Sequence, residues 1–125
     1  MKQIIHTDLA PKAVGPYSQA VMTKDMIYTS GRIPINPAEG KIVAETIEAQ
    51  TEQVMNNLKA VLAEAGVGMD RIVKTTCYLA DIADFAAFNG VYAQYFPENP
   101  PARSCFQVAA LPMGAKVEVE VIAVR

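Results

Sequence analysis

Residues Lys116–Val124 read KVEVEVIAV, and this stretch decides which fold the chain can adopt. Val117, Val119 and Val121 alternate with charged residues, the period of two that is typical of a strand with one buried face. Such a strand belongs to a sheet that packs its core on one side and leaves the other side polar. The rest of the chain must therefore supply the layer that covers the valine face.

Two segments have the apolar periodicity of helices. From Thr46 to Ala65 a single apolar stripe repeats at helical spacing, and Gly66 follows as a stop signal. A second helix is predicted to begin at an Asp81 cap and to end at Pro97. The aromatic face of this second helix consists of Phe85, Phe88, Tyr92, Tyr95 and Phe96.

The remaining β-rich segments complete a sheet. The predicted strands are 20–22 and 26–29, which form a hairpin, then 71–80, 103–109 and 116–124, the last two separated by a turn at 111–114. This order predicts an α+β domain, a single mixed β-sheet with two helices packed on one face. The other face of the sheet would be uncovered, which points to oligomerisation.

The composition indicates a single domain with part of its surface covered by another molecule. The chain has 125 residues, near the commonest domain size, so a single domain over residues 1–125 is predicted. Hydrophobic residues make up 51% of the chain and charged residues only 19%, against about 25% charged residues in an average soluble domain. Because a small domain needs relatively more polar surface, this deficit suggests that another copy of the chain covers part of the surface.

Charge and patterning argue against several classes of protein. Eleven basic and thirteen acidic residues give a net charge of −2, which does not favour binding to nucleic acid or to an anionic membrane. No apolar run has the length of a membrane-spanning helix, and no secretory signal is visible. Cys77 and Cys105 lie in apolar strand-like segments, so reduced thiols in a cytoplasmic protein are predicted over a disulfide.

The chain offers few residues for metal or nucleophilic chemistry. His6 is the only histidine, and no cysteines or carboxylates have ligand spacing, so no metal site is predicted. A catalytic triad or dyad would have to use His6, in a first or edge strand. Cys105 would be a nucleophile only if a positive group such as Arg103, on the same strand face, lowered the pKa of its thiol. A small buried thiol without a catalytic role is the simpler interpretation.

The segment Pro100–Phe106, PPARSCF, is the strongest local anomaly. Two rigid prolines lead into a strand whose first side chain is Arg103, in otherwise apolar surroundings. Because an unpaired buried guanidinium is costly, Arg103 is either ion-paired to a neighbour or available to an anionic ligand such as a carboxylate. The spacing alone does not decide between these two interpretations.

Glu118 and Glu120 lie on the polar face of the last strand. They either form a solvated face or line a cleft in which one of them acts as a general acid and base. If the turn at 111–114 joins adjacent antiparallel strands, Arg103 lies opposite the region of Ile122. Glu118 would then be about 13 Å away along the sheet, at about 3.3 Å per residue. In that register the two side chains could bind one small substrate only across two subunits.

Several separated motifs resemble one family over nearly the whole chain. The matching segments are Ala10–Pro11, Gly15–Gln19 (GPYSQ), Thr29–Gly31 (TSG), Ile72–Thr76 (IVKTT), Asn89 with Tyr92, Pro101–Cys105 (PARSC), Val108–Ala109, Leu111–Pro112 and Val117–Glu120 (VEVE). In this order and spacing they resemble the RidA (YjgF) family of reactive imine and enamine deaminases. The PARSC motif is the most specific of them.

The resemblance implies a chorismate-mutase-like fold and a homotrimer whose sheets form a central barrel with the helices outside. Three equivalent sites would lie in the clefts between subunits. The resemblance assigns Arg103 to the substrate carboxylate and Glu118 to the water and the proton, with Glu120 structural. The residues that it places along the pocket are Tyr17, Ser30, Gly31, Asn89 and Cys105. Among these, the glycine and the cysteine would contribute backbone groups.

The implied activity is hydrolytic deamination without a cofactor. Enamines such as 2-aminoacrylate and 2-aminocrotonate would tautomerise to 2-imino acids, which water would convert to 2-oxo acids and ammonia. The implied partners are small 2-imino and 2-oxo carboxylates and two further copies of the chain. A regulatory protein that binds such carboxylates without turnover is an alternative. An endoribonuclease or translation inhibitor is a second alternative, to which the acidic composition and the single histidine give little support.

The chain departs from the family pattern at three places. Arg32 follows Gly31 where glutamine is usual, Ala110 stands where many relatives have arginine, and Met113–Gly114 replaces a common Lys-Asp pair. The last two departures lie at or near the predicted turn, where they change surface charge. Arg32 is nearer to the expected cleft, where it would alter the charge or the entrance.

Overall fold

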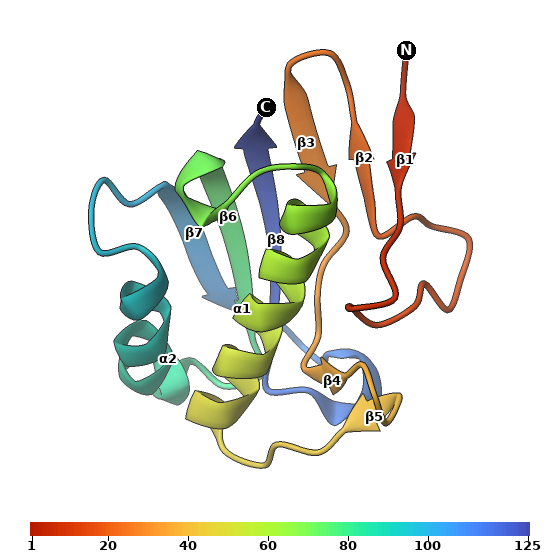
Figure 1. Ribbon diagram of the computed structural model, residues 1–125. Coiled ribbons are helices and arrows are strands. Elements are labelled where there is room, and N and C mark those ends of the chain that lie inside the picture. Colours follow the sequence, from red (N-terminus) through yellow and green to blue (C-terminus); the bar gives the residue numbers. More distant parts are fainter.

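One six-stranded mixed sheet forms the centre of the structure, a computed structural model that describes residues 1–125 (Figure 1). The strand order is β1-β2-β3-β8-β6-β7. Its strands are β1 (Gln3–Ile5), β2 (Ala20–Met22), β3 (Met26–Thr29), β6 (Ile72–Leu79), β7 (Ala102–Gln107) and β8 (Val117–Val124). β6 and β7 are parallel, and all other neighbouring strands are antiparallel. Two further strands, β4 (Ile35–Asn36) and β5 (Lys41–Ile42), pair with each other outside this sheet.

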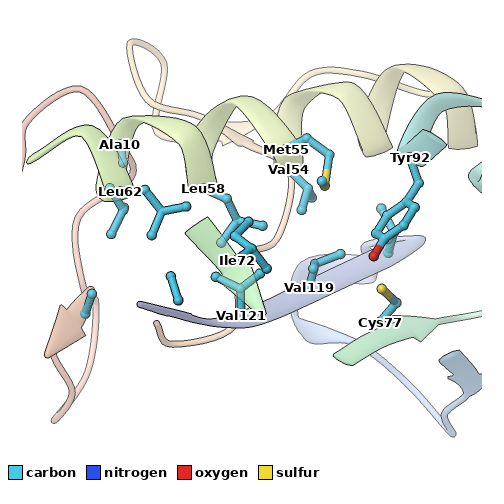
Figure 2. Packing of buried hydrophobic residues seen from close by; sticks show 14 of the residues in the cluster. Ala10, Val54, Met55, Leu58, Leu62, Ile72, Cys77, Tyr92, Val119 and Val121 are labelled. Atoms are coloured by element: carbon cyan, nitrogen blue, oxygen red, sulfur yellow. The ribbon is translucent and has the colours of Figure 1, made fainter. Parts of the chain in front are cut away.

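Helix α1 (Ile47–Glu64) covers one face of the sheet. It begins at its predicted cap, where the Thr46 hydroxyl accepts a hydrogen bond from the N–H of Ala49 at 3.1 Å. Its apolar stripe points at the valine face of β8, and Figure 2 shows Val54 and Leu58 above that strand. The alternation in β8 is confirmed, because its valines are buried in this layer while its glutamates lie on the opposite face.

The second predicted helix is divided into three short helical segments. They are a 3-10 turn at Ile82–Asp84, α2 (Phe85–Tyr92) and a 3-10 turn at Ala93–Tyr95. Asp81 is the predicted cap, and its carboxylate accepts a hydrogen bond from the N–H of Ala83 at 2.9 Å. Of the predicted aromatic face, Phe88, Tyr92 and Phe96 are buried, whereas Phe85 stays largely exposed. α2 packs against α1 on the same side of the sheet, so the prediction of two helices on one face is confirmed.

The expected pairing of the last two strands is wrong. The turn before β8 does not join neighbouring strands, because β6 lies between β7 and β8. The physical reason is that α2 carries the chain back over the sheet, so that β7 runs parallel to β6 and takes the edge. The other edge of β6, toward the centre of the sheet, then pairs with β8. The residue level with Arg103 on β8 is Val121, reached through Thr75. The predicted level, in the region of Ile122, is therefore correct to within one residue, although the two strands are not neighbours.

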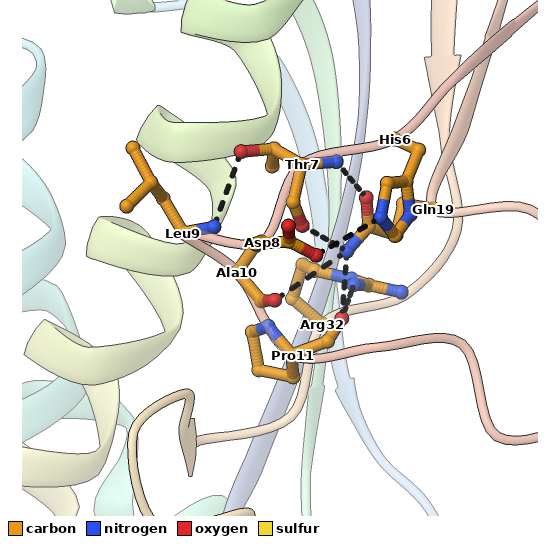
Figure 3. Close-up of polar contacts among 8 residues, drawn as sticks. All are labelled: His6, Thr7, Asp8, Leu9, Ala10, Pro11, Gln19 and Arg32. Carbon is orange, nitrogen blue, oxygen red and sulfur yellow. Dashed lines mark hydrogen bonds and ion pairs between the residues drawn. The ribbon is translucent and has the colours of Figure 1, made fainter.

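A buried amide organises the long connection between β1 and β2. The Gln19 carbonyl oxygen accepts a hydrogen bond from the N–H of Thr7 at 2.7 Å, and its Nε2 donates to the carbonyls of Thr7 and Pro11 at 3.0 and 2.8 Å (Figure 3). Arg32 Nη1 donates to the same Pro11 carbonyl at 3.4 Å. This cluster fixes the backbone from which the following loop, residues 11–17, departs.

The second face of the sheet carries no helix in this chain. Ile4, Tyr28 and Phe106 on this face are 53%, 42% and 45% exposed. The register places Ile4 and Tyr28 on the same face as Ile122, which alternates with the buried valines of β8. The uncovered apolar face expected from the sequence is therefore present. Neither helix could serve as a membrane span by length and hydropathy.

Candidate active site

A cavity of about 410 Å³ opens beside the first half of β8. Tyr17, Ser30, Gly31 and Glu118, four of the residues that the family resemblance assigns to the pocket, line it together. They come from three segments, the loop 11–17, the backbone that follows β3, and β8. The fold thus brings these four residues to one place, although they are far apart in the chain.

Gly31 allows the Glu118 carboxylate to lie against the backbone. The next residue, Arg32, pairs with Val119 of β8 through both backbone groups, at 2.8 and 3.1 Å. A Cβ atom added to Gly31 would collide with the Glu118 carboxylate. The carboxylate therefore occupies the space that a side chain at position 31 would need, which gives a physical reason for glycine there.

Ser30 and Tyr17 make hydrogen bonds within the cavity wall. The Ser30 hydroxyl donates to the carbonyl of Ser18 at 2.6 Å, and the Ser30 N–H donates to the carbonyl of Gln19 at 3.0 Å. The Tyr17 hydroxyl accepts a hydrogen bond from the N–H of Val14 at 3.3 Å. These bonds join the end of β3 to the loop before β2 and fix the shape of the cavity.

The electrostatic surroundings of Glu118 favour its neutral form. Burial raises the pKa of its carboxyl group, and the nearby charge of Glu120 raises it further, while Arg32 acts in the opposite direction. Glu120 itself accepts a hydrogen bond from the Tyr78 hydroxyl at 2.8 Å. The two glutamates of the strand are thus in different environments, and Glu118 is the one that lines the cavity.

Arg103 lies away from this cavity, on the helix-covered face of β7. Its Nη1 donates to the Asn89 side-chain oxygen at 2.7 Å, and its guanidinium lies 4.9 Å from the centre of the Tyr92 ring and 5.4 Å from that of Phe85. No carboxylate lies within ion-pair distance of it. Within this chain Arg103 is therefore not ion-paired, and its guanidinium keeps donors for a ligand.

Cys105 lies on the same strand face as Arg103 and beside Cys77, its partner in the β6–β7 register. Burial raises the pKa of the Cys105 thiol, and the charge of Arg103 only partly opposes this. Burial also raises the pKa of Cys77, to about 12. Both are free thiols in their neutral forms, so the geometry does not support a nucleophilic cysteine.

The candidate residues therefore form two groups in one chain. Arg103, Asn89 and Cys105 lie on the helix-covered side of the sheet, whereas Glu118 lies on the open side. Arg103 and Glu118 are also three residues apart along the strand direction, a distance of about 10 Å. Across the sheet they are two strands apart, which adds a separation of about 10 Å in the perpendicular direction. One small molecule cannot contact both side chains within a single chain.

Arg32 was expected near the cleft but was not predicted as a site residue. It lines the cavity with Glu118, and its side chain is almost fully buried. Its position directly after Gly31 was the available signal. Met113, noted only as a change of surface charge, also lines the cavity.

The single histidine lies outside the cavity. His6 is exposed, and its Nε2 lies 3.1 Å from the Asp8 carboxylate, the only contact of ion-pair length in the chain. No three His, Cys, Asp or Glu side chains are grouped so that they could hold a metal ion.

Comparisons with known proteins cover almost the whole chain. The family model described as Endoribonuclease L-PSP matches residues 7–125. The chloroplastic Reactive Intermediate Deaminase A of Arabidopsis thaliana is 48% identical over 122 residues, which are 98% of this chain and 65% of that protein. The AldR protein of Lactococcus lactis, whose name describes a regulator, is 49% identical over 121 residues, which are 97% of this chain and 96% of AldR.

Solved structures have the same fold. The Rid-family protein YyfA of Yersinia pestis is 49% identical, with a TM-score of 0.97 over the full length of both chains. TdcF of E. coli, solved with bound serine, is 44% identical, with a TM-score of 0.94 over 98% of each chain. Fold and cavity together define a small α+β protein with an ionisable carboxyl group beside an open sheet face. By the family model and these identities, the chain belongs to the RidA (YjgF) family. A named deaminase among its relatives supports deaminase activity at the level of the family.

Proposed function

We propose that the chain is a cofactor-independent hydrolytic deaminase of 2-iminobutanoate and 2-iminopropanoate, the tautomers of 2-aminocrotonate and 2-aminoacrylate. The observation that carries this proposal is the Glu118 carboxyl group, half-buried in the cavity with a raised pKa. A raised pKa brings a carboxyl group closer to the pH at which it can both accept and return a proton. The deaminase among the relatives supports the same reaction class.

The reaction needs one water molecule and one group that moves protons. The C=N carbon of a 2-imino acid is already electrophilic, so water can add to it. Glu118 accepts a proton as the water oxygen bonds to the carbon of the protonated C=N group, which gives a carbinolamine. Glu118 then returns this proton to the nitrogen. As the C–N bond breaks and the C=O bond forms, the hydroxyl proton of the carbinolamine passes to Glu118. Ammonia and a 2-oxo acid are released, and Glu118 gives up its proton to the ammonia, which restores the carboxylate. Arg103 would hold the substrate carboxylate through two parallel hydrogen bonds and so orient the C=N carbon.

The separation of Arg103 from Glu118 leads us to propose a site between two copies of the chain. In this proposal three copies assemble with their open sheet faces inward, as the resemblance to the family implies. The exposed apolar side chains of Ile4, Tyr28 and Phe106 would then be covered. β7 is an edge strand, so Arg103 of one copy can approach the Glu118 cavity of the next.

A coupled assay tests the proposed activity. A threonine or serine dehydratase generates the enamine, and release of the 2-oxo acid is followed with and without the protein. We expect acceleration by the wild-type protein, a raised KM for Arg103→Ala, and a loss of about 10²-fold or more in kcat for Glu118→Gln. Glu39→Gln, at an exposed residue that does not line the cavity, is the matched control and should behave as wild type.

Two results would overturn the assignment. No acceleration with either enamine would exclude the deaminase activity for these substrates. Full activity of Arg103→Ala would exclude the role given to that residue.

A carboxylate-binding regulator is the second candidate. Two observations favour it: a relative bears the name of a regulator, and TdcF was solved with bound serine, a ligand with a carboxylate. Glu118→Gln separates the candidates, since unchanged affinity for a 2-oxo acid with lost turnover supports catalysis. Ligand binding without turnover in either protein supports regulation. The description of the family model names an endoribonuclease, but the only histidine, His6, lies outside the cavity.

A further inference from the structure

Arg32 is the buried cation of the cavity wall. Its side chain is 4% exposed and lines the cavity together with Glu118. Its Nε donates to the Gly31 carbonyl at 3.2 Å, and its Nη1 donates to the Pro11 carbonyl at 3.4 Å. No carboxylate lies within ion-pair distance of the guanidinium. A buried guanidinium is costly without compensation, and burial lowers the pKa of Arg32, while Tyr17 and Glu118 favour its charged form.

The contacts of Arg32 connect three parts of the cavity. Its backbone N–H and C=O both bond to Val119, the residue after Glu118. Its side chain holds the carbonyl of Gly31, and the Glu118 carboxylate occupies the space where a Cβ atom of that same residue would lie. Its Nη1 donates to the carbonyl of Pro11, at the start of the loop that carries Tyr17, and Figure 3 shows this contact between Arg32 and Pro11. A change at Arg32 therefore affects three of the segments that surround the Glu118 carboxylate.

Several charged or titratable groups surround the Glu118 carboxyl group. They are Glu120 on the same strand, Tyr78 on β6, Arg32, and Tyr17 and Lys12 of the loop 11–17. In the proposed assembly Arg103 of a neighbouring copy would be added. Glu120 favours the neutral form of the carboxyl group, and Arg32 favours its charged form. Arg32 is the cation of this chain that acts on it.

We propose that Arg32 is a positioning residue for the deamination: it holds the Gly31 and Pro11 walls around Glu118, and its charge opposes the burial that favours the neutral form of that carboxyl group. The catalytic part of this inference rests on the proposed function. The coupling between Arg32 and Glu118 does not depend on any activity and can be measured by itself.

The coupling is tested by titrating the Glu118 carboxyl carbon by NMR, with its signal assigned from the Glu118→Gln spectrum. Arg32→Gln keeps a hydrogen-bond donor but removes the charge, so we expect the titration midpoint to rise by about 0.5 pH unit or more. Arg32→Lys should keep most of the wild-type midpoint. Glu120→Gln should shift the midpoint in the opposite direction, because it removes a like charge and can still accept from Tyr78. Arg71→Gln, near the other end of β6, is the control for an equal change of net charge.

The catalytic part is tested by the pH dependence of kcat/KM in the coupled assay. In Arg32→Gln the acidic limb should move to higher pH, in step with the NMR midpoint, and Arg32→Lys should restore it. A merely structural role would lower activity without moving this limb and would overturn the inference, as would an unchanged NMR midpoint in Arg32→Gln. If even the wild-type protein has no deaminase activity, the proposed function fails, while the NMR titration still decides whether Arg32 controls the charge of Glu118.

Discussion

The Glu118 carboxylate fills the space beside Gly31, so that a Cβ atom added to this glycine would collide with it. A substitution that adds this one atom therefore tests whether the position of Glu118 matters for activity. The backbone of Gly31 does not have a left-handed conformation, so alanine is tolerated there apart from the collision with the carboxylate. Gly31→Ala should therefore fold but displace Glu118. Since a shift of about 1 Å can cost about 10²-fold in rate, we expect a loss of that order in the coupled assay.

Gly90→Ala is the matched control for this prediction. Gly90 lies in α2, and an added Cβ meets no atom within 4 Å. The control should keep its activity and gain up to about 1 kcal/mol of stability, because alanine favours a helix more than glycine does. Wild-type activity in Gly31→Ala would contradict the role of Glu118.

Glu118 also makes stability depend on pH. Burial, followed by the charge of Glu120, raises the pKa of its carboxyl group in the folded state above that in the unfolded chain, and Arg32 partly opposes this. The folded state thus binds the proton more tightly than the unfolded chain does. The stability that this group contributes therefore falls as the pH rises from the pKa of Glu118 in the unfolded chain to its higher pKa in the folded state. Glu118→Gln, which carries no charge, should have a higher Tm than wild type at pH 7. The difference should disappear below about pH 4, where both are neutral.

Thermal unfolding followed by circular dichroism between about pH 3 and pH 7 measures this difference. Glu39→Gln removes a charge from an exposed loop and should show no such dependence. A lower Tm for Glu118→Gln at pH 7 would show that the charged form stabilises the fold.

The sequence allows the face of a residue to be predicted more readily than its surroundings. The alternation in β8 placed Glu118 and Glu120 on one face, as the structure has them. It could not distinguish their environments, because these depend on a glycine and a loop that are distant in the sequence. Arg32 was missed as a site residue for the same reason: its burial comes from Pro11 and its neighbours, which no local periodicity reveals.

At the scale of elements, the Gln19 cluster fixes the connection between β1 and β2. Gln19→Leu keeps the approximate volume but leaves the N–H and C=O of Thr7 without partners and removes one of the donors to Pro11. Because unpaired buried polar groups are costly, we expect a loss of about 2 kcal/mol or more in the free energy of unfolding, measured with urea. Activity should fall too, since this connection leads into the cavity wall.

Gln94→Leu is the control for this change. Gln94 also donates to a carbonyl, that of Gly90 at 3.1 Å, but the pair is exposed and water can replace the bond. Its substitution should change stability by less than about 0.5 kcal/mol. A loss in Gln19→Leu no larger than in Gln94→Leu would contradict the assigned role of the cluster.

The two helices and the longer strands were predictable here because their signals are local, whereas the two-residue strands β4 and β5 were not predicted. Thr46 as a cap and Gly66 as a stop define α1, and β-branched residues define β6. The order of the strands was not predictable from the turn before β8, since that turn is compatible with two arrangements. The crossover through α2 decides between them, and it requires knowing that β7 takes the edge beside β6.

At the scale of the whole molecule, a shared site can be recognised by mixing two variants that each have little activity when the substrate concentration is well below the raised KM of Arg103→Ala. Arg103→Ala and Glu118→Gln subunits, unfolded and refolded together, would form mixed trimers in which an intact Arg103 meets an intact Glu118 of the neighbour. Random assortment restores about one site in four, so we expect up to about a quarter of the wild-type activity. The coupled assay measures this recovery.

The double variant, mixed with either single variant, is the control and should recover no activity. If each site lay within one chain, the mixture of single variants would remain inactive as well. A monomeric state by analytical ultracentrifugation would contradict both the trimer and the shared site.

The place of β8 in the sheet has a consequence for how the chain is made. β8 is the last strand in chain order, yet it lies in the middle of the sheet, between β3 and β6. Until it emerges from the ribosome, the earlier strands exist as two unconnected groups, and the valines that complete the core are missing. Folding during synthesis must therefore wait for the end of translation of this domain. The carboxylate of the candidate site arrives with the same strand, so the nascent chain gains its core and its chemistry in one step.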